Sequence, residues 1–282
     1  MEQTPNNLAA FCWSIADLLR VNLKRRQLVS VLLLWFVSSV SLLVEASSHA
    51  NRIFVGGDNN YPPYEFINDA GEPDGYNTEL TQAIAEVMGM DVEIELGNWD
   101  MIRKRIEAGE IQALQGMVYS EDRAKIYSFS PPHTFIYQSI FARTGTAPAK
   151  TVDALRGKQV IVQKGGSMHD YLVHSEADAQ LILVATHADA LRLLSSGEHD
   201  YALVNNLPGL YFGRKLELTN IVPVGQPVPA QRYGYSVLKG NEELLARFSE
   251  GLAIVKNTGR QQEIYDKWLG ALEESSSPWK KI

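Results

Sequence analysis

Apolar residues between positions 52 and 118 recur with a period that switches between strand and helix. The run at 53–55 is short and apolar and ends in two glycines, which is typical of a strand. Residues 80–88 instead repeat apolar side chains at helical spacing, and Gly89 follows as a stop signal. Further elements are expected at 92–96, 100–109 and 111–118. The resulting β-α-β-α-β order predicts an α/β fold with a parallel sheet covered by helices. Segment 58–75, rich in Pro, Gly, Asn and Asp, is predicted to be loop and turn.

The pattern restarts after Gly145 and predicts a second unit of the same kind. A strand at 160–162 leads through two glycines to a helix at Ser167. Thr186 and Asp189 form a capping box at the start of another helix. Later strands are expected at 201–204, 221–224 and 233–238, and later helices from Pro208, over 244–255 and after Gly259.

The N-terminal residues have the character of an export signal. Three basic residues at 24–26 precede an uncharged run of 17 residues, 28–44. Basic residues before an apolar run stay in the cytoplasm, so the rest of the chain is expected to cross the membrane. Small residues at positions −3 and −1 predict cleavage after Ala50. We interpret residues 1–50 as a cleaved signal peptide; an uncleaved inner-membrane anchor and a buried core helix are the alternatives.

Charge and cysteine content narrow the function classes. The net charge of −7 over 282 residues excludes a basic nucleic-acid footprint. Without residues 1–50, 22 basic and 30 acidic side chains remain, a net charge of −8. Cys12 is the single cysteine, so neither an intrachain disulfide nor a cysteine zinc site can form. The histidines lack metal-ligand spacing, and no nucleophile elbow, phosphate loop or dinucleotide fingerprint occurs. We expect no metal, no cofactor and no catalytic residue, in an exported globule suited to binding or sensing.

Two candidate binding segments follow early strands. Segment 58–66, from Asp58 through Tyr61 to Phe66, comes directly after the first strand, and ligands of open α/β sheets lie beyond the carboxyl ends of strands. Its aromatic rings either stack on a ligand or fill the core. Trp99-Asp100 opens the next predicted helix; a packed indole is the alternative interpretation.

Three polar features add candidate chemistry. Arg123 follows two acidic residues; the arginine fork grips a carboxylate bidentately, and a surface ion pair is the alternative. Gly165-Gly166-Ser167 stands at a strand-to-helix junction, where free N–H groups and the helix dipole favour an anion, an ordinary cap being the alternative. Asn205 ends a predicted strand and is a candidate to contact a ligand; an ordinary loop amide is the alternative interpretation.

In their order, these features resemble family 3 of the bacterial periplasmic solute-binding proteins. The resemblance covers 53–270. It is carried by Tyr61-Pro62-Pro63-Tyr64, Gly71 with Gly75-Tyr76, Trp99-Asp100, Arg123 followed by Phe129-Ser130-Pro131, Gly166-Ser167, and Asp200 to Asn205. It implies a two-lobed periplasmic-binding-protein type II fold, in which each lobe is a mostly parallel sheet with flanking helices. Two strands cross between the lobes at a hinge.

The resemblance also implies boundaries and site residues. Lobe 1 would comprise 51–142 plus 232–270, lobe 2 would comprise 143–231, and 271–282 would be a polar tail. The hinge crossings would fall at 142–145 and 226–231. The implied ligand-binding residues are Asp58, Tyr61, Trp99, Gly116, Val118, Arg123, Gly166, Ser167, Met168 and Asn205. Tyr61 would stack on the ligand, while Arg123 and the helix start at Ser167 would hold its carboxylate.

The implied function is closure on a small carboxylate-bearing ligand, anionic or zwitterionic, in the periplasm. Its partner would be an ABC transporter permease or a membrane sensor. The family normally has an aspartate at position 205 for the ligand's ammonium group, whereas Asn205 supplies no full charge. Residues 201–270 resemble flytrap sensor domains of signalling proteins, which is the first alternative. Cyclohexadienyl and arogenate dehydratases resemble these binding proteins too, and a dehydratase with Asp58 or Glu65 as its acid is the second.

Overall fold

The computed structural model describes residues 52–174, 178–270 and 272. The leader expected at 1–50 lies outside these residues, as does the tail expected at 271–282 apart from Leu272. Among the described helices, none combines the length and the apolar character required to span a bilayer.

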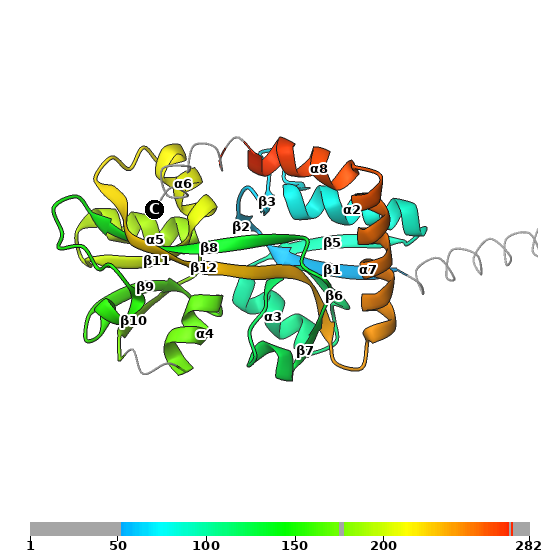
Figure 1. Ribbon diagram of the computed structural model, residues 1–282, viewed down its shortest axis with the longest axis horizontal. Coiled ribbons are helices and arrows are strands. Elements are labelled where there is room, and N and C mark those ends of the chain that lie inside the picture. Colours follow the sequence, from blue (N-terminus) through cyan, green and yellow to red (C-terminus); the bar gives the residue numbers. More distant parts are fainter. Residues whose placement is uncertain (1–51, 175–177, 271, 273–282) are drawn as a thin grey trace, which may run out of the picture. The chain divides into compact units, whose positions relative to one another are not determined.

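Two lobes joined by two long strands make up the described chain (Figure 1). Lobe 1, at the right of Figure 1, is built on the parallel strands β1 (Ile53–Asp58), β5 (Val92–Gly97) and β6 (Ala113–Val118). Its helical elements are α2 (Tyr76–Met88), α3 (Trp99–Glu107), the turn η1 (Arg123–Lys125), α7 (Glu242–Asn257), α8 (Arg260–Tyr265) and η3 (Asp266–Gly270). Its short strands are β2 (Asn60–Tyr61), β3 (Glu65–Ile67), β4 (Pro73–Asp74) and β7 (Tyr127–Phe129).

Lobe 2 repeats the same architecture on a smaller scale. Its parallel strands are β9 (Gln159–Gln163), β10 (Gln180–Val184) and β11 (Tyr201–Asn205). Its helical elements are η2 (Val152–Leu155), α4 (Ser167–His174), α5 (His187–Ser196) and α6 (Asn206–Lys215). The predicted pair of α/β units is therefore present.

The strands β8 (Thr134–Arg143) and β12 (Ile221–Leu238) pair antiparallel with each other and run through both lobes. They join the two parallel sheets into one, with the order β10-β9-β11-β8-β12-β6-β1-β5 and β7 beside β12. Figure 1 shows both strands passing from one lobe to the other. This paired ribbon connects the two lobes.

The pairing partners of this ribbon indicate where it crosses. β8 pairs with β11 of lobe 2 from Gln138 to Ala142, so the crossing expected at 142–145 lies at the far end of a lobe 2 pairing. We propose instead that β8 crosses near Gln138. The pairing of β12 with β8 is irregular between Val224 and Gln231, which coincides with the second expected crossing. The lobe boundaries remain a proposal, shifted by about four residues in β8.

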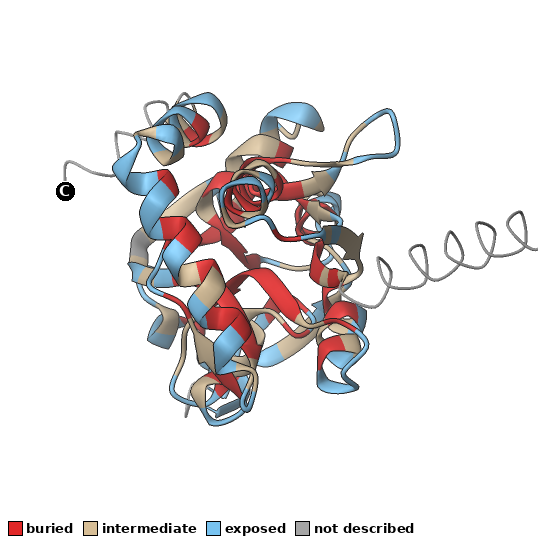
Figure 2. Cartoon of the chain, turned by 90° about the vertical axis from the view of Figure 1, so that its right-hand side faces the viewer, coloured by how far each residue is buried: buried red, intermediate tan, exposed pale blue. Residues whose placement is uncertain are grey.

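Local signals place several elements as predicted. The Thr186 hydroxyl accepts a hydrogen bond from the Asp189 backbone N–H at the start of α5, which satisfies one orphan amide of the first turn. Gly89 ends α2 in the left-handed conformation, with a φ of 58°, as a helix stop requires. Buried residues gather on the strands and on the inward faces of the helices (Figure 2).

The core of lobe 1 is assembled from both ends of the chain. Its largest cluster packs Val55 and Leu80 with Tyr235, Phe248 and Leu252. The rings of Tyr235 and Phe248 are stacked, with centroids 4.8 Å apart. Lobe 2 has its own two clusters, drawn from residues between Ile140 and Val224.

Three expectations differ from the structure. The expected strands at 221–224 and 233–238 are parts of the single strand β12. Segment 58–75 is not only loop, because β2, β3 and β4 form a small three-stranded sheet there. The strands β7, β8 and β10 were not predicted from the pattern.

Candidate functional site

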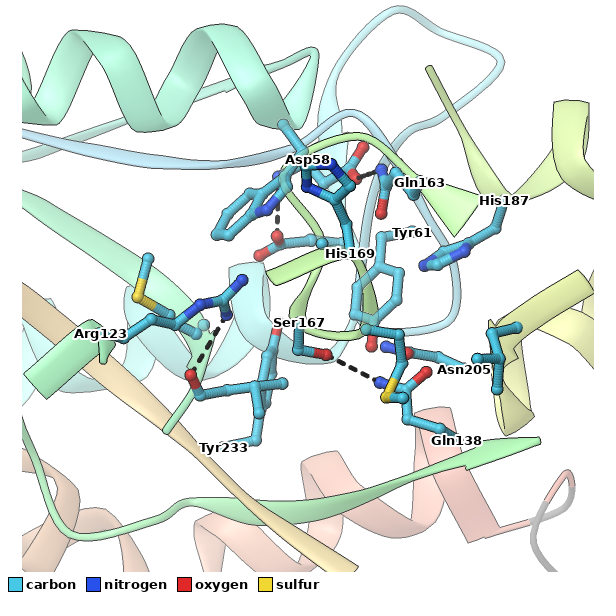
Figure 3. A pocket seen from close by; sticks show the side chains of 18 residues that line it. Asp58, Tyr61, Arg123, Gln138, Gln163, Ser167, His169, His187, Asn205 and Tyr233 are labelled. Carbon is cyan, nitrogen blue, oxygen red and sulfur yellow. Dashed lines mark hydrogen bonds between the residues drawn. The ribbon is translucent and has the colours of Figure 1, made fainter. Parts of the chain in front are cut away.

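A pocket lies between the lobes, at the carboxyl ends of β1, β6, β9 and β11 (Figure 3). The space in it that water-sized molecules can occupy is about 40 Å³, because the two lobes are in contact around it. All the residues implied by the family resemblance line it: Asp58, Tyr61, Trp99, Gly116, Val118, Arg123, Gly166, Ser167, Met168 and Asn205. The fold thus brings together side chains that are far apart in sequence.

The pocket has further lining residues beyond the ten that the family resemblance implies. They are Glu65, Met117, Gln138, Gln163, His169, His187, Leu203 and Tyr233. Two of them had an available signal, because Gln163 follows the predicted strand at 160–162 and His187 follows the helix cap Thr186. Gln138 lies on β8, which the pattern did not predict.

Asp58 connects the lobes at one end of the pocket. Its side chain is 4% exposed. The Gln163 amide of lobe 2 donates to its Oδ2 at 2.7 Å, and the Asn60 backbone N–H donates to its Oδ1 at 2.8 Å. Burial raises the pKa of Asp58 to about 6, although both hydrogen bonds favour the carboxylate.

Glu65 lies beneath Asp58, with 1% of its surface exposed. The Asp58 backbone N–H donates to its Oε1 at 2.7 Å. The amides of Asn77 and Gln115 donate to its Oε2 at 2.8 and 2.9 Å. Burial nevertheless raises the pKa of Glu65 to about 8, because the ionised form loses its hydration.

This raised pKa predicts that thermal stability falls as the pH rises from 6.5 to about 8 and levels off above pH 8. The folded state holds the Glu65 proton up to about pH 8, while the unfolded chain releases it near 4.5, so folding is favoured less as pH rises through this range. The pKa values of three other buried groups lie below this window. They are about 4 for His133 and His187 and about 6 for Asp58. Thermal melts by circular dichroism should show the decline in the wild type and a flatter profile in Glu65→Gln. Equal slopes in both proteins would contradict the assignment.

The guanidinium of Arg123 is buried at the other end of the pocket and is bound mainly by lobe 2. Its Nε donates to Asp170 Oδ2 at 2.9 Å, and its Nη2 lies 2.8 Å from the same oxygen. Arg103 also reaches Asp170 Oδ2, at 3.2 Å. Two guanidinium groups therefore share the Asp170 carboxylate, and Glu107, 4.0 Å from Arg103, is a second carboxylate beside them. The surface-ion-pair interpretation of Arg123 is wrong, because its side chain is 4% exposed.

The carbonyl of Gly165 in lobe 2 accepts hydrogen bonds from three lobe 1 side chains. The Trp99 indole N–H donates at 2.8 Å, Arg103 Nη1 at 2.9 Å and Arg123 Nη2 at 3.1 Å. Trp99 also packs in the core beside Ile102, so the indole is packed as the alternative interpretation expected, and it lines the pocket as well. Together with the Asp170 pairs, these bonds hold the lobes in contact across the pocket.

The N-terminus of α4 and the side-chain carboxamide of Asn205 both line the pocket. Ser167 opens α4, and the first backbone N–H groups of a helix have no acceptor within it. The Ser167 hydroxyl accepts from the Gln138 amide at 3.0 Å. Asn205 stands at the N-cap position of α6 without a side-chain capping bond, and no hydrogen bond within the described chain engages its carboxamide. Gly116 leaves room for Tyr233, whose ring a Cβ there would strike.

No group of three or more His, Cys, Asp or Glu side chains in the described ranges is arranged to hold a metal ion. The chemistry that this site supports is recognition of a small molecule with a polar group at each end. One end presents the cationic Arg123 and the amides of α4, and the other presents Asp58.

Comparisons with known proteins agree with this geometry. The L-cystine-binding protein TcyJ of Escherichia coli (strain K12) is 28% identical over 262 residues, covering 89% of this chain and 97% of TcyJ. The ABC transporter glutamine-binding protein GlnH of Bacillus subtilis (strain 168) is 24% identical and covers 71% of this chain and 74% of GlnH.

Solved structures extend the likeness to the fold. A histidine kinase sensor domain with similarity to periplasmic binding proteins is 52% identical, with a TM-score of 0.75, and covers 78% of this chain and 96% of that one. An ancestral arginine-binding protein bound to glutamine is 29% identical, with a TM-score of 0.71, and covers 78% and 98%. The predicted two-lobed periplasmic-binding-protein type II fold is confirmed. Because residues 53–271 match the family model as well, the chain belongs to the bacterial extracellular solute-binding proteins, family 3.

Proposed function

We propose that this protein is an exported receptor whose lobes close on a small carboxylate-bearing ligand and present it to a membrane partner. The observation that carries the proposal is the pocket between the lobes, with Arg123 at one end and Asp58 at the other. Relatives named for binding cystine, glutamine and arginine support a ligand of amino-acid size.

The ligand's carboxylate is proposed to lie against Arg123 and the start of α4. The buried guanidinium of Arg123 favours an anion there. The amides and dipole of the helix start favour it too. Asn205 can donate or accept a hydrogen bond but carries no charge, so an ammonium group on the ligand is not required.

A thermal-shift screen tests this proposal. The probes are L-cystine, L-glutamine, L-arginine and succinate, each with purified protein at pH 7.5. A ligand at 100 times its Kd stabilises the folded state by about 2.7 kcal/mol, which is a readily measured shift. A folded protein that none of the carboxylate probes stabilises would overturn the proposal.

Asn205→Asp should alter the preference between ligand classes. The new carboxylate is expected to repel succinate and to attract the ammonium group of an α-amino acid, because opposite charges at hydrogen-bond distance interact favourably. Isothermal titration calorimetry of both proteins with succinate and L-glutamine measures the change. An unaltered ratio of the two affinities would show that Asn205 does not face the ligand's α-carbon.

Transport and sensing are both compatible with such a receptor, and different relatives favour each. TcyJ and GlnH support delivery to an ABC transporter. The 52% identical kinase sensor domain supports presentation to a signalling protein. Neighbouring genes discriminate the two: a permease with an ATPase indicates uptake, and a kinase or cyclase indicates sensing. The relatives are named for binding their ligands, and we propose a binding role without catalysis.

Export is the remaining part of the proposal. The mature protein is proposed to begin near Asn51, on the basis of the basic and apolar pattern in the leader. Intact-mass measurement on a periplasmic extract decides between cleavage and anchoring. Recovery of the full-length chain from membranes alone would favour the anchor.

A further inference from the structure

Two polar atoms that line the pocket are buried without a hydrogen-bond partner in the described chain: the Tyr61 hydroxyl and Nδ1 of His187. Both side chains are 5% exposed. A buried polar atom left unpaired costs free energy, so native proteins rarely retain one unless it serves a ligand or a water. These two atoms therefore need an explanation.

The two side chains face each other from opposite lobes. Tyr61 lies on β2 of lobe 1, where its ring is stacked on Tyr64 with centroids 5.0 Å apart. His187 is the first residue of α5 in lobe 2, directly after the cap Thr186. The Tyr61 and His187 ring centroids are 5.3 Å apart, at an interplanar angle of 40° (Figure 3). They form one wall of the pocket only when the lobes are in contact.

Asp58 belongs to the same end of the pocket. The Gln163 amide that binds Asp58 also donates to the carbonyl of Ala185 at 3.2 Å, two residues before His187. Arg123 and Asp170 lie at the other end. We infer, resting on the proposed function, that the Tyr61 hydroxyl and the His187 imidazole bind the far end of the ligand and select a side chain ending in N–H donors, a carboxamide or a guanidinium.

The chemistry of the wall favours a donor group over an anion or a hydrocarbon. The ionised Asp58 carboxylate only accepts hydrogen bonds, whereas the phenol and the neutral imidazole can each accept one and donate one, so acceptors outnumber donors on this wall. Burial lowers the pKa of His187 to about 4, so the imidazole offers no positive charge to an anionic side chain at neutral pH. A hydrocarbon side chain would leave the two buried atoms unpaired. Sites built to hydrogen-bond a polar group discriminate strongly against analogues that lack it.

Calorimetry with four probes at pH 7.5 tests the inference: L-glutamine, L-arginine, L-glutamate and L-norleucine. Glutamine and glutamate have nearly the same shape, so their ratio isolates the donor amide. In the wild type, glutamine or arginine is expected to bind at least about tenfold more tightly than both glutamate and norleucine. The stronger of the two identifies the carboxamide or the guanidinium as the preferred group.

Tyr61→Phe and His187→Phe remove the polar atoms and retain the rings. Each is expected to reduce the ratio of polar-probe affinity to norleucine affinity at least about fivefold, with norleucine binding unchanged or tighter. Tyr64→Phe is the matched control, because Tyr64 stacks on Tyr61 without lining the pocket. Tyr64→Phe should have the same ratio of polar-probe affinity to norleucine affinity as the wild type. Tyr61→Phe deletes a single unpaired oxygen, so its fold is preserved even where the His187 variant is destabilised.

The outcomes separate the inference from the function on which it rests. A wild type that prefers norleucine or glutamate overturns the donor-group inference and leaves the receptor proposal in place. Unchanged ratios in both phenylalanine variants do the same. A folded wild type that binds none of these four probes, and neither L-cystine nor succinate, overturns the receptor proposal and the inference with it.

Discussion

Arg123→Ala is expected to weaken the binding of a carboxylate-bearing ligand by more than tenfold. Truncating one partner of a buried, hydrogen-bonded charge pair costs about 2–5 kcal/mol, because the other charge stays desolvated. A change of 1.4 kcal/mol is tenfold in Kd. The variant also leaves Asp170 with Arg103 as its remaining arginine partner. Calorimetry with the tightest probe from the screen measures the loss.

Two further variants make this result specific. Arg192→Ala is the matched control, because Arg192 is 56% exposed and pairs with the surface residue Asp189; its affinity should be unchanged. Arg123→Lys retains the charge without the planar fork and is expected to bind with intermediate affinity. If Arg123→Ala bound the ligand with wild-type affinity, the ligand's carboxylate would not lie at this end of the pocket.

Asp170→Ala should destabilise the closed arrangement of the lobes. It would leave Arg103 and Arg123 close together, with no carboxylate of lobe 2 to compensate them. Removing one partner of a buried ion pair costs about 3–5 kcal/mol, and the lower end applies here because Asp170 keeps 21% of its side chain exposed. If ligand is held in the closed form, affinity should fall roughly hundredfold, mostly through faster dissociation.

Small-angle scattering and stopped-flow dissociation check this expectation. Ligand-saturated wild type should be more compact than ligand-saturated Asp170→Ala. Glu263→Ala is the control, because Glu263 is 67% exposed and pairs with Arg260 within lobe 1. The double variant with Arg123→Ala should lose less than the sum of the two single losses, since both remove one pair. Full additivity, or unaltered dissociation in Asp170→Ala, would mean that the pair does not hold the lobes.

Local signals were sufficient for the α-helices and for the parallel strands other than β10. The glycine stop at Gly89 and the capping box at Thr186 act through neighbouring backbone atoms, so sequence alone places them. The strand β8 was missed although it is long, because no turn signal separates it from the loop at Pro131-Pro132. β12 was divided in two because its middle, around 225–230, carries glycine and prolines that usually interrupt strands.

The candidate site was likewise predicted only in part. Among its ten implied residues, six belong to the ordered set of motifs: Tyr61, Trp99, Arg123, Gly166, Ser167 and Asn205. Asp170, Gln163 and His187 escaped prediction because their partners belong to the opposite lobe. Which side chains of two lobes meet depends on how the paired ribbon of β8 and β12 orients them, and a linear pattern does not encode this. The single charge of Arg123 was predicted, but its sharing of Asp170 with Arg103 was not.

The shared core of lobe 1 has a consequence for the order in which the protein folds. Lobe 2 is one continuous stretch of chain, so in a chain exported as proposed it can complete its core once that stretch has crossed the membrane. Lobe 1 cannot, because Val55 and Leu80 pack against Tyr235, Phe248 and Leu252, which emerge last. The N-terminal strands must therefore wait, with their apolar faces uncovered, while about 150 intervening residues are translocated. A periplasmic holding chaperone would find its binding surface in that interval, on β1 and α2 rather than on lobe 2.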